Sequence, residues 1–298
     1  MSKKNIKILV AHHKPGYICE NEVFLPIQVG KVNSDFDLSI QGDDTGDNIS
    51  RLNPNYCELT AMYWAWKNLK NVDYIGLCHY RRYFDFKSNF VIKNLIIKNL
   101  DELEFYEAQY YKIERFLKKY DIIVPKANVY PYNLRINYSS EHLSTDFFVL
   151  YDVIKDLYPE YCASYEYIME QNNNLFPYNM FVTNYSIFEN YCQWLFDILF
   201  EVEKRIDISN YSLTQSRIFG YMSERLLNVY IYKNNFKVKT LPVILFDNEL
   251  KNEYSLRYLL RFYKTKFIFK LSSINIAKKE VNIYEKRKSL YLYKNLKG

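Results

Sequence analysis

The stretch from residue 73 to residue 84, DYIGLCHYRRYF, joins an apolar run to fixed positive charge. The apolar part is typical of a buried strand, and three basic side chains follow it: His79, Arg81 and Arg82. A guanidinium group binds a phosphate or a carboxylate through two parallel hydrogen bonds. In an extended chain, His79 and Arg81 would share one face and Arg82 the opposite face, so one arginine would face a ligand. A diphosphate site is one interpretation, and ion pairs with nearby acids such as Asp85 are another.

An acidic loop forms a second candidate site. Residues 43–47, DDTGD, place three carboxylates in five positions, a composition that suits Mg²⁺ or the hydroxyl groups of ribose and other sugars. A solvated turn has the same composition. The segment lacks the spacing of an EF-hand loop, so the sequence does not predict a calcium site.

A third group lies in the stretch EHLSTD. His142 and Asp146 are four residues apart, so on a helix they would share one face, where either could act as a general base. The alternative is that Glu141 and Asp146 cap the N-terminus of the helix and compensate the positive end of its dipole. Further along, Arg217 and Glu224 could also be members of a helix salt-bridge set.

Alternating strands and helices would position these groups. Apolar runs that are typical of buried strands occur at residues 6–13, 73–78, 120–126 and 236–244. Helical spacing follows Pro54 and recurs over residues 100–119, 141–161, 186–205 and 216–233. This order predicts an α/β fold with a mostly parallel, Rossmann-like sheet flanked by helices, and a mainly helical second half. Because ligands bind at the carboxyl ends of parallel strands, we expect His12, His79 and Lys126 along one edge.

Charge is distributed unevenly along the chain. The net charge is +6, but from Leu250 to Gly298 we count 13 Lys and Arg against 3 Asp and Glu, which leaves the preceding residues at −4. We therefore expect two parts, an α/β domain at residues 1–248 and a basic aromatic extension at residues 249–298. Cations mixed with Leu, Phe and Tyr suit docking on an anionic membrane surface. A solvated appendage or a contact between subunits is the alternative.

Composition and missing motifs disfavour several classes of protein. The five cysteines are scattered along the chain, which favours reduced thiols and a cytoplasmic location. They form no CxxC pair, which argues against a structural zinc site. No apolar run is long enough to span a membrane. The GxGxxG, Walker A, GxSxG and HExxH motifs are absent, which argues against dinucleotide oxidoreductases, P-loop enzymes, α/β-hydrolases and zincins. The basic tail would also suit nucleic acid, but the main body is net negative, so we expect no nucleic-acid partner.

In this order the motifs resemble a family of bacterial polysaccharide-locus glycosyltransferases that was formerly catalogued only as a domain of unknown function. The resemblance covers roughly residues 6–245 and rests on the stretches ILVAHHKP, DDTGDNISRLNPNYCELTAMYWAWKN, DYIGLCHYRRYF, DIIVPK, EHLSTDFFVLYDVIKDLYPEY, NMFVTNYSIFENYCQWLFDIL and QSRIFGYMSERLLNVYIYK. It implies a GT-A-like domain that transfers a sugar from a nucleotide-sugar donor to a glycan or lipid-linked acceptor in capsule, O-antigen or exopolysaccharide synthesis. The donor it suggests is UDP-linked, with galactose or galactofuranose as candidates. A non-catalytic sugar-binding or nucleic-acid-binding protein is the alternative.

The resemblance also implies roles for individual residues. The donor-binding residues would be His12, Asp43, Asp44, Asn48, Asn53, Glu58, His79, Arg82, Asn179 and Arg217. The acceptor-binding residues would be Glu141 and Glu224, and the catalytic residues Arg81, His142 and Asp146. In an inverting reaction, His142 or Asp146 would be the base that deprotonates the acceptor hydroxyl.

Metal dependence is the point at which this sequence differs from most GT-A enzymes. His79, Arg81 and Arg82 stand where the resemblance places a metal-binding DxD motif. We therefore predict transfer without a metal or other cofactor, with Arg81 or Arg82 stabilising the leaving diphosphate. The alternative is that Asp43 and Asp44 recruit Mg²⁺ or Mn²⁺.

We expect a cytoplasmic protein, and the tail would allow peripheral attachment to the inner face of the plasma membrane. The sequence makes no prediction of the oligomeric state.

Overall fold

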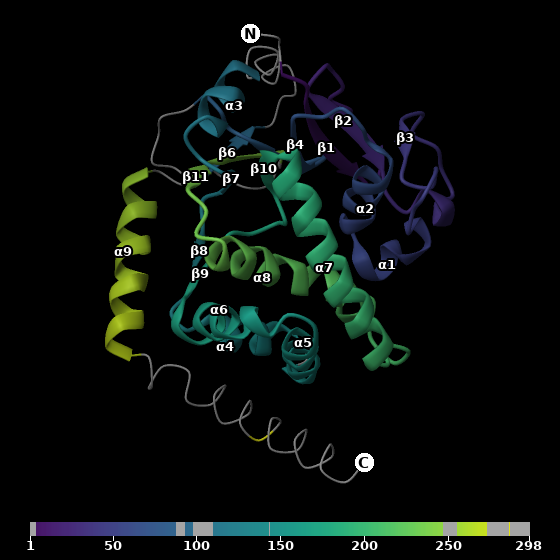
Figure 1. The fold of residues 1–298 in the computed structure, drawn as a ribbon. Helices are drawn as coiled ribbons and strands as arrows, with labels where there is room; N and C mark the ends of the chain where they lie inside the picture. Colours follow the sequence, from purple (N-terminus) through teal and green to yellow (C-terminus); the bar gives the residue numbers. More distant parts are fainter. Residues whose placement is uncertain are drawn as a thin grey trace.

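A mostly parallel sheet forms the centre of the protein. The structure, a computed structural model, describes residues 4–87, 93–97, 110–142, 144–246, 255–272 and 286. Seven strands follow one another in the order β11-β7-β10-β4-β1-β2-β3 (Figure 1). Their bounds are β1 Ile6–His12, β2 Phe24–Gln28, β3 Gln41–Gly42, β4 Tyr74–His79, β7 Ile122–Pro125, β10 Phe181–Asn184 and β11 Val238–Leu241. β4, β1, β2 and β3 run parallel, as do β7 and β11, whereas β10 is antiparallel to β4 and β7. The fold class expected from the sequence is confirmed.

Three further strands extend this sheet beside β4. They are β5 (Arg82–Phe84), β6 (Asn94–Ile97) and β12 (Val243–Phe246), and β12 pairs with both of the others. The single strand predicted at 236–244 is therefore two strands, β11 and β12, separated at Pro242. Proline has no N–H group to donate, which interrupts the ladder at that position. A separate pair, β8 (Asn128–Val129) and β9 (Asn174–Leu175), completes the described strands.

The helices described lie mainly in the second half of the chain. They are α1 Asn53–Tyr56, α2 Leu59–Asn68, α3 Tyr110–Leu117, α4 Leu134–Glu141, α5 Ser144–Leu157, α6 Cys162–Glu166, α7 Tyr185–Arg205, α8 Ile218–Lys233 and α9 Ser255–Ser272. The helices predicted at 186–205 and 216–233 are confirmed as α7 and α8. The helix predicted from residue 141 instead begins at Ser144, because α4 ends at Glu141 and His142 adopts an extended backbone conformation. Of the helix predicted over 100–119, residues 100–109 lie outside the described part.

The central strands are buried on both faces. In β1, Leu9 and Ala11 belong to a core that includes apolar residues of α2, α5, α7 and α8. Ile8 and Val10 point the other way, into a core shared with α3, β5 and β12. Burial on both faces is typical of a parallel sheet covered by helices. It leaves the carboxyl edge of the sheet as the place for a ligand.

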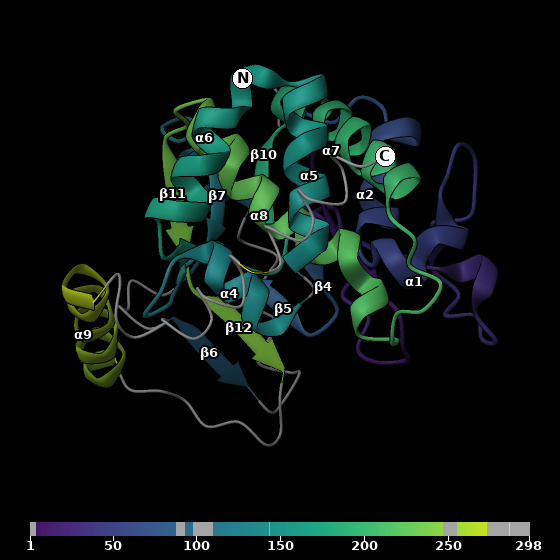
Figure 2. The same cartoon turned by 90° about the horizontal axis from the view of Figure 1, so that it is seen from below.

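Helix α9 lies at the periphery of the molecule (Figures 1 and 2). It packs beside β8 and is the main described part of the basic extension. Apart from α9 and residue 286, residues 249–298 lie outside the described part, so the division into two domains stays a prediction. None of the helices that the structure describes is long and apolar enough to cross a membrane.

Candidate functional site

The basic stretch after β4 forms a hairpin rather than one extended strand. β4 ends at His79, and β5 begins at Arg82, which pairs with His79 in the antiparallel ladder. Tyr80 and Arg81 therefore form a two-residue turn. The chain reversal makes His79 and Arg82 neighbours, and both line the same pocket. The expectation that these two side chains face opposite sides is wrong, because the chain does not continue straight.

A pocket of about 500 Å³ opens where β1, β2 and β4 end. Ala11 of β1, Val29 after β2 and His79 of β4 contribute to its wall, so it lies at the edge expected to bind ligands. Six of the residues identified from the sequence line it: Asn53, Glu58, His79, Arg82, Arg217 and Glu224. Lys126, also expected at this edge, is not among the lining residues.

Two arginines bring fixed positive charge to the pocket. The guanidinium of Arg82 lies over the ring of Tyr178, with Cζ 4.6 Å from the ring centroid. A stacked guanidinium keeps N–H groups in its own plane to donate to an anion. Nε of Arg217 donates to Sγ of Cys57 at 3.2 Å. Burial lowers the pKa of His13, and Arg217 is among the cations that lower it further. The pocket is therefore suited to a phosphate or diphosphate group.

The backbone holds His79 in one orientation. Its Nε2 lies 2.7 Å from the carbonyl oxygen of Tyr178. Because a carbonyl oxygen only accepts, Nε2 carries the proton of this hydrogen bond. Burial is the largest cause of the lowered pKa of His79, so the ring is neutral at pH 7. A neutral ring with its proton on Nε2 has a lone pair on Nδ1 that can accept a hydrogen bond.

Two carboxylates also line the pocket. Glu224 accepts hydrogen bonds from the backbone N–H of Tyr178 at 2.9 Å and from Nη1 of Arg225 at 3.1 Å. Glu58 accepts one from Nδ2 of Asn179 at 2.7 Å. Burial is the largest cause of the raised pKa of Glu224, and the charge of Glu58 adds to it against the opposite effect of Arg225. The site thus combines anion-binding groups with carboxylates that can accept a proton.

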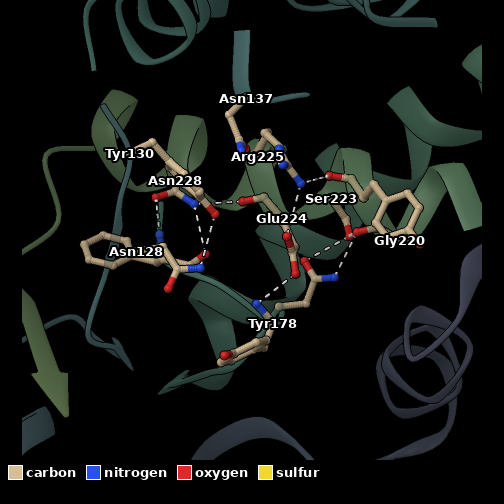
Figure 3. A network of polar contacts seen from close by, with 12 residues as sticks. Asn128, Tyr130, Asn137, Tyr178, Gly220, Ser223, Glu224, Arg225 and Asn228 are labelled. Atoms are coloured by element: carbon tan, nitrogen blue, oxygen red, sulfur yellow. Dashed lines mark hydrogen bonds and ion pairs between the residues drawn. The ribbon is translucent and has the colours of Figure 1, made fainter. Parts of the chain in front are cut away.

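A network of polar contacts connects these groups to α8 (Figure 3). Arg225 is 2% exposed and donates through Nη2 to Oδ1 of Asn137 at 2.9 Å. Asn228 accepts from the N–H of Phe176 at 3.0 Å and donates to its carbonyl at 3.2 Å. These contacts hold the turn that carries Tyr178, whose φ is 73°. α8 therefore positions both the carboxylate of Glu224 and the main-chain groups that contact it.

Tyr178 is a site residue that the sequence analysis did not identify. It contacts His79 through its carbonyl, Arg82 through its ring and Glu224 through its N–H. Nothing distinguishes it among 31 tyrosines except the proline and asparagine beside it, which are typical of a turn. Cys57 was missed as well. Cys57 lines the pocket between the end of α1 and the start of α2, and its backbone φ is 53°.

Asp43, in the acidic loop, lies in the interior. Its side chain is 0% exposed, and it accepts hydrogen bonds from four protein donors. These are the backbone N–H groups of Gly30 (2.8 Å) and Lys31 (3.1 Å) and the hydroxyls of Ser50 and Thr60, both at 2.5 Å. Each carboxylate oxygen has two of these donors. Asp43 therefore connects the loop to the turn that follows β2 and to α2, and a metal ion could reach its oxygens only by displacing protein donors.

The other two residues predicted in this loop do not line the pocket either. Asp44 is exposed, and Nδ2 of Asn48 donates to its backbone carbonyl at 3.1 Å. Within the ranges that the structure describes, no three His, Cys, Asp or Glu side chains form a group that could hold a metal ion.

Three further predicted residues lie beside the pocket rather than in its wall. Arg81 is exposed in the hairpin turn, and its Nε donates to the carbonyl of Phe246 at 2.9 Å. His12 is 0% exposed and packs against Tyr80, with ring centroids 5.6 Å apart. Burial lowers the pKa of His12 to about 4, so its ring is neutral. Asn179 is 2% exposed and acts on the pocket through its hydrogen bond to Glu58.

The predicted acceptor and base residues around the α4–α5 junction are not among the lining residues. His142 stacks on Tyr221, with centroids 4.0 Å apart. Asp146 is 3% exposed and accepts from the hydroxyl of Tyr211 at 2.7 Å. Burial raises the pKa of Asp146 to about 6. Because the helix is interrupted between them, His142 and Asp146 do not share one helix face. The side chain of Glu141 lies outside the described part.

Comparisons with known proteins identify a family and one solved structure. A family model described as a domain of unknown function, DUF4422, matches residues 7–235. The apo structure of the WbbM bifunctional glycosyltransferase is similar to this chain, with a TM-score of 0.75 and 34% sequence identity. The similarity covers 84% of this chain and 48% of that one, so this chain spans about half of its length. A search of curated proteins found no match.

Proposed function

The chain belongs to the family described as a domain of unknown function, DUF4422, and from this premise we propose that it is a glycosyltransferase. It would transfer a sugar from a nucleotide-sugar donor to a glycan or lipid-linked acceptor in capsule, O-antigen or exopolysaccharide synthesis. The donor we propose is UDP-linked, with galactose or galactofuranose as the sugar. Similarity to a bifunctional glycosyltransferase over 84% of the chain supports the reaction type.

The observation that carries this proposal is the composition of the pocket at the carboxyl edge of the sheet. Arg82 and Arg217 offer cationic donors for a diphosphate, and Glu58 and Glu224 offer acceptors for sugar hydroxyls. The volume of about 500 Å³ is in the range of small-molecule sites. A diphosphate and a polar sugar would satisfy both kinds of group at once.

In the reaction we propose, the acceptor hydroxyl oxygen attacks the anomeric carbon of the donor sugar. The bond from that carbon to the diphosphate oxygen breaks, and its electron pair leaves with the nucleoside diphosphate. Arg82 stabilises the negative charge that develops on this leaving group. We propose that fixed cations supply this stabilisation without a divalent metal.

The acceptor hydroxyl must also lose its proton. The sequence indicated His142 or Asp146 as the base, but we propose Glu224 because it lines the pocket itself. Its oxygens accept from Tyr178 and Arg225, which fixes the carboxylate in place. The raised pKa of Glu224 brings it closer to neutral pH, where a general base is most effective.

Nucleotide-sugar binding and turnover test the proposal. In a panel of UDP-, GDP- and TDP-sugars, we expect one donor class to raise the thermal midpoint and to be hydrolysed or transferred. Binding without turnover would identify a non-catalytic sugar-binding protein. Activity that is unchanged by EDTA would support transfer without a metal. Loss of activity in EDTA with rescue by Mg²⁺ or Mn²⁺ would refute it.

The two adjacent arginines provide a matched pair of variants. Arg82→Ala should weaken UDP binding by about 10- to 150-fold, because hydrogen bonds to charged groups contribute ~1.5–3 kcal/mol. Arg81→Ala removes the same charge from the exposed turn and should change the Kd by less than about threefold. Isothermal titration calorimetry with UDP measures both. A larger loss in Arg81→Ala than in Arg82→Ala would assign the diphosphate to Arg81.

A further inference from the structure

Helix α9, Ser255–Ser272, presents an exposed apolar stripe that the rest of the described structure does not cover. The stripe consists of Leu260, Tyr263, Phe267 and Leu271, which are 64%, 65%, 62% and 72% exposed. At about 100° per residue these four side chains occupy an arc of about 80° on the helix. Four large apolar side chains in one row on a surface helix mark a contact with an apolar partner.

Cations border the exposed stripe on both sides. Along the helix they are Arg257, Arg261, Lys264, Lys266 and Lys270. By helical geometry, Arg257 and Lys264 lie on one side of the stripe and Lys270 on the other. Arg261 lines the cavity between α9 and the body, and Lys266 lies over the ring of Phe262 on that side. The helix contains no Asp or Glu, so its five cations are not balanced within it. An apolar row between two basic rows is the pattern of a helix that lies in a membrane interface.

The opposite side of α9 packs on the protein. Phe262, about 200° from Leu260 around the helix, lines a small cavity together with Asn128 and Tyr130. The body of the protein therefore lies along one side of α9, which is at the edge of the molecule (Figures 1 and 2). The side chains of the exposed stripe remain accessible to solvent.

We propose that α9 docks the protein on an anionic lipid membrane, with the exposed stripe inserted between the lipids and the cations contacting their headgroups. A second copy of the chain fits less well, because two such helices would bring five positive charges against five. Nucleic acid would attract the cations but would leave the central apolar row without a partner. α9 has eighteen residues and is not apolar enough to cross a membrane, so it would lie on the surface. This docking does not depend on the proposed reaction.

Sedimentation of the full chain with lipid vesicles tests the proposal. We expect binding to phosphatidylglycerol–phosphatidylethanolamine vesicles that weakens as salt is added, and much weaker binding to phosphatidylcholine vesicles. Tyr263→Ser combined with Phe267→Ser should reduce the partition coefficient by at least about 30-fold, because two large apolar side chains no longer insert. Tyr111→Ser is the matched control, since Tyr111 is 68% exposed on α3, and it should bind like the parent.

A charge variant makes the test independent of the apolar residues. Lys264→Gln combined with Lys270→Gln should weaken binding to the anionic vesicles by about 30-fold, since each cation contributes about fivefold. Equal binding to both kinds of vesicle, or no loss in either double variant, would overturn the proposal. A concentration-dependent dimer that the Tyr263/Phe267 variant loses would identify a second copy as the partner instead. Retention on DNA without binding to vesicles would identify nucleic acid.

Discussion

The substitution Asp43→Asn distinguishes a structural role of the acidic loop from a metal-binding role. The sequence allows Asp43 and Asp44 to recruit Mg²⁺ or Mn²⁺. In the structure Asp43 is 0% exposed and accepts four hydrogen bonds, two on each carboxylate oxygen. We expect its removal to affect the stability of the fold and not the metal dependence of the reaction.

The size of the effect follows from the donors around Asp43. Asparagine has the same shape, but its NH₂ group can only donate. In either orientation this group faces one hydroxyl and one backbone N–H, that of Gly30 or of Lys31. The hydroxyl can rotate to accept, whereas the backbone N–H cannot. Losing one charge-assisted hydrogen bond (~1.5–3 kcal/mol) and leaving one buried donor without an acceptor (~1–3 kcal/mol) predicts a loss of about 2.5–6 kcal/mol.

Urea and thermal unfolding measure this loss. For a chain of this size the thermal midpoint should fall by about 10 °C. Asp44→Asn is the matched control, because Asp44 is exposed, and it should change the free energy of unfolding by less than about 0.5 kcal/mol. Mg²⁺ should shift the midpoint of neither variant. An Asp43→Asn protein with the stability of the wild type would refute the structural role. The role would also be refuted if Mg²⁺ raised the thermal midpoint of the wild type but not that of Asp43→Asn.

Two further predictions concern the carboxylates near the pocket. Glu224→Gln should lower kcat by about 100-fold or more, because the general base is lost. Asp146→Asn should lower kcat by less than about tenfold. A larger loss in Asp146→Asn than in Glu224→Gln would identify Asp146 as the base. Burial raises the pKa of Asp146 from 3.8 to about 6. Between these two pH values the folded state binds more protons than the unfolded state. The free energy of unfolding therefore falls as the pH rises from about 4 to about 6. Asp146→Asn lacks this contribution, so urea titrations should show it gaining about 2.4 kcal/mol relative to wild type between pH 4 and pH 7. A difference that is constant with pH would show that the carboxyl is not buried as described.

The pattern of residues along the chain predicts the class of fold and the edge of the sheet at which the pocket lies. Apolar runs at residues 6–13, 73–78 and 120–126 have the length and composition of buried strands, and β1, β4 and β7 lie there. These patterns depend on neighbours along the chain, so a single sequence contains them. Because parallel strands end at one edge, the order of elements also predicted that His79 lies at the edge where the pocket opens.

Which side chains reach that pocket depends on contacts between elements that are distant in the sequence. A turn at Tyr80 and Arg81 reverses the chain, which brings Arg82 into the pocket wall and leaves Arg81 exposed. Tyr178 becomes a site residue through contacts with groups far away in the sequence, such as its hydrogen bond to Glu224. Local periodicity carries no information on such contacts, because they depend on where separate elements pack. The chemistry of the candidate site therefore follows from the turn at Tyr178, which connects Glu224 of α8 to His79 of β4 and Arg82 of β5.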